Sequence, residues 1–111
     1  MPEYWTNTVT LYVRTGGSYV RAGIFEGCFW ARRDSYVYDN GHRFTRNSFI
    51  CRIPYAAAAE PGDILVLGDT SALITDSAAF LKAHAGDAFR VSKASALEGS
   101  LYHQKCEGTN P

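Results

Sequence analysis

The chain has 111 residues, a length that suits one domain and is too short for two ordinary ones. Its 46% hydrophobic and 20% charged residues are typical of a globular protein and exclude a disordered chain. Eleven basic and eleven acidic side chains give a formal net charge of zero, which argues against a general affinity for nucleic acid or anionic membranes and suits self-association.

The N-terminal residues, from Met1 to Trp5, lack the basic region and apolar run of a signal peptide. The longest apolar run, from Ile64 to Leu67, has the length of a strand and is too short to cross a membrane. We therefore expect the protein to fold in the cytoplasm without contacting a membrane.

The first two predicted strands form a hairpin. Residues 8–14 alternate apolar and polar side chains, which is the pattern of a half-buried strand. Gly16-Gly17 then supplies a turn in which a positive φ costs little. A second strand over residues 19–25 pairs back antiparallel; Gly27 breaks or bulges it, and residues 28–31 continue it.

The clearest local signal is Asn40-Gly41, the dipeptide favoured in two-residue type I′ hairpin turns. This turn sets Val37 opposite Phe44 on one face of the predicted hairpin. Its candidate partner-contact residues are Tyr36, Tyr38, Arg43, Thr45 and Arg46, of which the first four share the other face.

Later segments predict further short strands and one helix. Strands are expected over residues 49–53, 64–67, 88–93 and 101–107. Residues 55–60 form either one helical turn or an irregular crossing. The helix is expected over residues 77–85, with Asp76 as its N-cap, Gly86 after its C-terminus, and Ala79, Phe80 and Ala83 as its apolar stripe.

These segments predict a mainly β fold in one domain over residues 1–111. The fold is a small antiparallel β-barrel or sandwich of seven or eight short strands with one short helix, because no βαβ alternation calls for a parallel sheet. Residues 1–6 and 108–111 are expected to be flexible.

No spacing of cysteine, histidine or carboxylate residues matches a known metal or catalytic site. Cys28, Cys51 and Cys106 form no CxxC pair, and in a reducing compartment such cysteines are typically buried thiols. His103 and Cys106 are three residues apart, which sets them on opposite faces of a strand. We therefore predict no catalytic residue, no cofactor and no metal site, and rank an enzyme below the binding functions.

Carboxylates and glycines have simple structural interpretations too. Asp63, Asp69 and Asp76 lie beside glycines or at a helix start, where turn and cap preferences explain them. Gly16-Gly17 lacks the downstream glycine and lysine of a phosphate-binding loop.

Basic and aromatic residues interleave from Trp30 to Arg52, and two kinds of partner can use that composition. On a β-surface such residues can stack bases and hold phosphates. Tyr, Trp and Arg are also enriched in protein–protein interfaces. The lack of net positive charge favours a protein partner, and a small nucleic-acid-binding barrel is the alternative function.

Six short motifs follow one another along nearly the whole chain: NTVTLY (7–12), GCFW (27–30), ICRIP (50–54), PGDILVLG (61–68), FRV (89–91) and HQKCEG (103–108). This series resembles small proteins of unknown function encoded in the head–tail connector region of tailed phages and prophages of gut Firmicutes. The motifs are structural rather than catalytic.

The resemblance implies a structural component of the phage neck, such as the stopper that closes the portal channel after genome packaging. Such stoppers are small β-barrels assembled as rings. The implied partners are further copies of the chain, portal or adaptor proteins and tail proteins, with packaged DNA as a further contact. The implied location is the bacterial host cytoplasm during assembly and then the neck of the virion. The family implies no catalytic residues.

Overall fold

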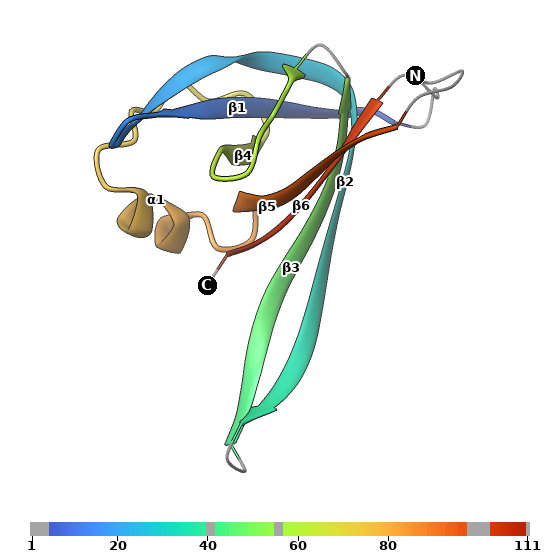
Figure 1. Cartoon of the computed structure of the whole chain (residues 1–111), viewed down its shortest axis with the longest axis vertical. Coiled ribbons are helices and arrows are strands. Elements are labelled where there is room, and N and C mark those ends of the chain that lie inside the picture. The colour runs from blue at the N-terminus through green and yellow to red at the C-terminus, as the bar shows by residue number, and fades with distance from the viewer. Residues whose placement is uncertain (1–4, 40–41, 55–56, 98–102, 111) are drawn as a thin grey trace.

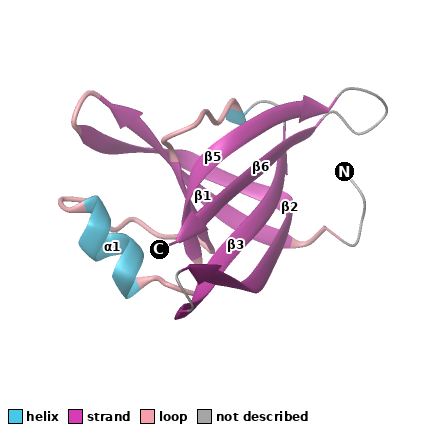
Figure 2. Ribbon diagram, turned by 60° about the horizontal axis from the view of Figure 1, so that its bottom comes forward, coloured by secondary structure: helices cyan, strands magenta, loops and turns pink. Residues whose placement is uncertain are grey.

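Strands far apart in the sequence pair into one antiparallel sheet that closes on itself, as the computed structural model of the protein shows (Figures 1 and 2). The structure describes residues 5–39, 42–54, 57–97 and 103–110, and it describes no side chains for residues 33–47 and 96–97. Around the barrel the strand order is β1-β2-β3-β6-β5-β4. The elements in the described part are β1 (Asn7–Thr15), β2 (Ser18–Asp39), β3 (His42–Pro54), β4 (Ile64–Leu67), α1 (Ser77–Ala83), β5 (Ala88–Leu97) and β6 (His103–Asn110).

The prediction of a mainly β barrel with one short helix is confirmed, but the described chain has six strands rather than seven or eight. Residues 19–25 and 28–31 belong to a single strand, β2, which passes through a register shift beside Gly27 (φ 69°). Likewise, residues 42–46 and 49–53 both belong to β3. A bulge bends a strand without ending it, and a glycine in the sequence does not distinguish the two outcomes.

Both predicted hairpins are confirmed, and so is the register predicted for the second. Thr15 lies opposite Ser18 across the turn at Gly16-Gly17, where Gly16 has a φ of 63°. In the second hairpin Val37 lies opposite Phe44, as the predicted turn requires. The turn residues themselves, Asn40-Gly41, lie outside the described residues.

The barrel interior is filled by side chains from all six strands. At its centre, the rings of Phe49 and Phe89 stack 5.2 Å apart and nearly parallel, and Trp30 packs against both. Aromatic side chains bury large apolar areas, so this group contributes strongly to the stability of the barrel. The other fully buried aliphatic members are Val9, Leu11, Ile53, Leu65 and Val91.

A second apolar layer explains why β4 is apolar along its whole length. Leu65 belongs to the barrel core, whereas Ile64 and Val66 pack on the outside of the sheet with Leu81 of α1. Tyr12 of β1 joins this outer cluster and is also buried. The strand is therefore covered on both faces, which a continuous apolar run predicts.

The helix α1 begins as predicted and ends two residues early. The carboxylate of Asp76 accepts hydrogen bonds from two N–H groups of the first turn, while the C-cap is His84 rather than the residue before Gly86. The buried residue is Leu81, so the predicted stripe through Ala79 and Ala83 is wrong. Of the predicted stripe only Phe80 packs against the sheet, where it lies partly buried against the cluster that contains Leu81.

The flexible ends that we expect from the sequence are wrong for Trp5 and for residues 108–110. Trp5 is only 8% exposed, and its ring lies 5.1 Å from the ring of His103 in an edge-on arrangement. β6 continues to Asn110, which is buried and donates hydrogen bonds to the carbonyl oxygens of Leu81 (2.7 Å) and Ala88 (2.9 Å). These contacts tie the end of β6 to α1 and to the start of β5.

The segment of residues 55–60 is described from residue 57 onward: Ala57 has 3₁₀-helical geometry, and residues 58–60 are irregular. The side chain of Gln104 holds the segment in place, accepting from the N–H of Ala59 (2.9 Å) and donating to its carbonyl oxygen (2.6 Å). Ala59 is buried in the barrel core as a result.

Candidate functional site

The predicted partner-contact hairpin forms a two-stranded ribbon that leaves the barrel (Figure 1). β1 pairs with β2 only as far as Cys28, and β6 pairs with β3 only from Asn47 to Pro54. Residues 35–39 and 42–46, which we call the ribbon, therefore pair only with each other among the described strands. Both long edges of the ribbon offer backbone N–H and C=O groups to another chain.

All five candidate contact residues have their backbone in the ribbon. Tyr36 lies opposite Thr45, Tyr38 opposite Arg43, and Arg46 opposite Ser35, so the predicted pairing is confirmed. Their side chains lie outside the described part of the structure, and their contact role stays a prediction.

Other members of the basic and aromatic segment serve the barrel instead. Trp30 and Phe49 pack in the core. Arg52 donates through Nη1 to Nε2 of His103, at 2.9 Å. Because these three side chains are engaged within the barrel, the ribbon is the part of the segment that we consider as a contact surface for a partner.

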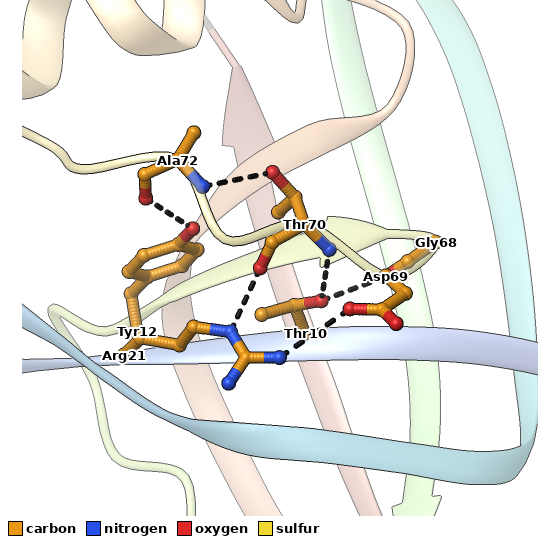
Figure 3. Close-up of polar contacts among 7 residues, drawn as sticks. All are labelled: Thr10, Tyr12, Arg21, Gly68, Asp69, Thr70 and Ala72. Atoms are coloured by element: carbon orange, nitrogen blue, oxygen red, sulfur yellow. Dashed lines mark hydrogen bonds and ion pairs between the residues drawn. The ribbon is translucent and has the colours of Figure 1, made fainter.

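A polar network holds the loop of residues 68–72 against the outside of β1 (Figure 3). The hydroxyl of Thr10 donates to the carbonyl oxygen of Gly68 (2.7 Å) and accepts from the N–H of Thr70 (3.1 Å). The hydroxyl of Tyr12 donates to the carbonyl oxygen of Ala72 (2.6 Å). Because Thr10 and Tyr12 are buried, these bonds fix the path of the loop.

The same loop is tied to β2 through Arg21 (Figure 3). Its Nε donates to the carbonyl oxygen of Thr70 (2.8 Å), and its Nη2 lies 3.3 Å from a carboxylate oxygen of Asp69. Asp69 stays 64% exposed, so its carboxylate is both fixed in position and open to a partner.

Beside this loop lies an open hollow of about 710 Å³, which we call the acidic hollow. Its apolar part includes Ile24, a residue 40% exposed. Its two carboxylates are Asp69 and Glu26, and Glu26 has no ion-pair partner within the described ranges. The full lining is Thr8, Ile24, Phe25, Glu26 and Asp69.

Sequence reasoning missed the acidic hollow and assigned Asp69 only a role in a turn. Its residues come from β1, β2 and the loop after β4, and no local pattern links them. The exposure of the apolar residue Ile24, which β2 leaves 40% exposed, is likewise known only from the structure.

A second hollow, of about 470 Å³, lies where the ribbon joins the barrel. It is lined mainly by small and apolar residues, among them Ala31, Ser48 and Ile50. The single carboxylate in its lining, Glu107, is paired with Lys105 at 3.3 Å.

The three cysteines are buried and free, as predicted, and they belong to one core cluster. Cys51 and Cys106 lie directly opposite each other on β3 and β6. Burial raises the pKa of Cys28 and of Cys106 to about 12, and it raises the pKa of Cys51 as well. The thiols stay protonated at neutral pH and are poor nucleophiles.

The remaining polar candidates are dispersed. His103 and Cys106 lie on opposite faces of β6, as predicted, with His103 packed against Trp5 and Cys106 in the core. Asp63 is buried and accepts from the N–H groups of Arg14 (3.0 Å) and Glu60 (2.9 Å), which confirms its structural role. No group of three or more metal-binding side chains gathers in the parts of the chain that the structure describes.

The protein matches no family model, no curated protein and no solved structure. Within the described ranges, no helix is long and apolar enough to span a membrane.

Proposed function

We propose that this chain is a structural protein of phage virion assembly, a stopper-like component of the head–tail connector that acts by forming rings and docking to proteins. Its partners are further copies of itself, portal or adaptor proteins, and tail proteins. The protein acts in the host cytoplasm during assembly and then in the neck of the virion. The resemblance of its motifs to connector-region proteins motivates this proposal, and a small closed barrel suits it.

The observation that carries the proposal is the ribbon. A two-stranded ribbon without a third strand is marginally stable in water, and its open edges favour pairing or packing with another chain. Such an element suits a docking function better than a catalytic one. The three buried thiols, with their raised pKa values, also support a structural role.

Ring formation by the purified chain tests the proposal. We expect native mass spectrometry and negative-stain electron microscopy to show closed rings of the wild type. Replacing Tyr36, Tyr38 and Arg43 together with alanine should abolish the rings and lower virion yield, while the thermal unfolding curve stays unchanged. The control is Lys93→Ala, at an exposed position on β5, which should assemble normally. Unchanged rings and virion yield in the triple variant would contradict the proposal.

The alternative function is nucleic-acid binding through the Tyr- and Arg-rich segment between residues 30 and 52. Trp30 and Phe49 are engaged in the core and Arg52 in a bond to His103, which leaves fewer groups for stacking and phosphate contacts. A mobility shift with single-stranded DNA that weakens as salt rises would favour this alternative over protein docking.

A further inference from the structure

We infer that the ribbon of one copy docks into the acidic hollow of the next copy, so that the subunits associate head to tail. This inference rests on the proposed function and names the two surfaces that meet.

The acidic hollow has the chemistry of a docking site for a basic, aromatic segment. It places the exposed side chain of Ile24 beside the carboxylates of Glu26 and Asp69. Glu26 lacks an ion-pair partner among the described residues, so it is available to a cation from outside. The bonds of Thr10 and Arg21 to the loop hold Asp69 in place before a partner arrives, which lowers the entropic cost of binding (Figure 3).

The ribbon is the complementary segment of the same chain. The charges of the chain sum to zero but are unevenly distributed: residues 35–46 hold two basic side chains, Arg43 and Arg46, and one acidic side chain, Asp39. The ribbon therefore carries a net charge of +1, and the rest of the chain carries −1. Complementary charge steers association and fixes its register.

The occupant must be another copy, because the ribbon points away from the hollow of its own chain. Figure 1 shows the ribbon running away from β1, one of the two strands that line the hollow. The molecule is 46 Å along its longest axis and 30 Å along the next, so the ribbon extends well beyond the barrel. Two different surfaces then meet at each contact, and such a contact closes into a ring or continues as a filament.

Charge reversal on each surface tests the inference. Glu26→Arg changes the hollow, and Arg43→Glu combined with Arg46→Glu changes the ribbon. In sedimentation velocity at low salt, each variant alone should show a dissociation constant raised at least about tenfold. An equimolar mixture of the two variants should restore association, because the wild-type ribbon meets the wild-type hollow and the reversed ribbon meets the reversed hollow.

The control is Glu60→Arg, the same reversal at an exposed residue outside the hollow, which should assemble like the wild type. Normal assembly of Glu26→Arg, or a mixture that does not associate, would overturn the head-to-tail contact and leave the proposed function standing. A wild-type chain that stays monomeric at all concentrations would overturn both. Circular dichroism of each variant establishes that its barrel is folded.

Discussion

His103 is a histidine whose surroundings favour its neutral form. It is 7% exposed, packs against the ring of Trp5, and accepts from Arg52 at Nε2. Burial and the charge of Arg52 lower its pKa below the ordinary value of 6.5. Since Nε2 accepts a hydrogen bond from a guanidinium, the folded protein holds the neutral imidazole with its proton on Nδ1.

This arrangement predicts a loss of stability in mild acid. As the pH falls below 6.5, His103 becomes protonated in the unfolded chain but stays neutral in the folded chain until its lower pKa is reached. The free energy of unfolding therefore falls as the pH falls from 6.5 toward the pKa of the folded state. Urea unfolding between pH 7.5 and 5.5 measures the effect. His103→Gln should reduce the slope, and Lys93→Ala, at an exposed residue of β5, should retain it. Equal slopes in His103→Gln and the wild type would refute the prediction.

Gly108 is required by packing rather than by backbone conformation. It is buried in β6, opposite Phe49 and Val91. A Cβ atom at this position would overlap the carbonyl oxygen of Arg90 and lie 2.6 Å from Cδ2 of Phe89. Neither a sheet carbonyl nor a stacked core ring can move aside cheaply.

We therefore expect Gly108→Ala to lower the free energy of unfolding by about 1–3 kcal/mol or more, as for overpacking of a core. Gly23→Ala is the matched control, because a Cβ there would have nothing within 4 Å. Its effect should stay within about 0.5 kcal/mol. Urea denaturation of both variants measures the difference, and equal stability of the two would show that the barrel relaxes around residue 108.

At the scale of elements, the ribbon is separable from the barrel. The described members of both apolar clusters lie outside residues 35–46, and β3 keeps its pairing with β6 from Asn47 onward. The ribbon extends two barrel strands but closes no part of the barrel.

Replacing residues 35–46 with Asn-Gly should therefore leave a folded barrel that no longer assembles. The dipeptide can join Asp34 to Asn47, which already lie opposite each other, by a two-residue turn. We expect a midpoint of thermal unfolding within about 4 °C of the wild type, since the core is untouched. The same dipeptide in place of Gly16-Gly17 is the control and should keep assembly. Loss of the cooperative transition would show that the ribbon belongs to the folding unit.

At the scale of the whole molecule, local signals predicted elements more accurately than they predicted the assembly of those elements. The N-cap at Asp76 and the turn at Gly16-Gly17 were correct because each acts through backbone bonds within a few residues. Whether Gly27 breaks or bulges the strand was left open, because the outcome depends on whether β1 continues to pair beyond this residue; the structure shows a bulge. The choice between barrel and sandwich was left open, since closure requires β1 to pair with β4, more than fifty residues away.

Of the two candidate surfaces, the sequence predicts the ribbon but not the acidic hollow. The ribbon and its register follow from one turn, since side chains alternate along a strand and a two-residue turn therefore sets every pair that follows. The acidic hollow does not follow from the sequence, because Thr8, Glu26 and Asp69 become neighbours only when β1, β2 and the loop after β4 are brought together.

By itself, the sequence determined the mainly β class, the two hairpins with the register of the second, the start of the helix and the burial of three thiols. Each of these depends on residue type and on contacts within a few positions. Only the tertiary structure decided which strands close the barrel, that Trp5 and Asn110 are buried, and that an exposed apolar residue lies beside two carboxylates. The reason is that burial and charge environment are set by residues distant in the sequence, which the closure of the sheet brings into contact.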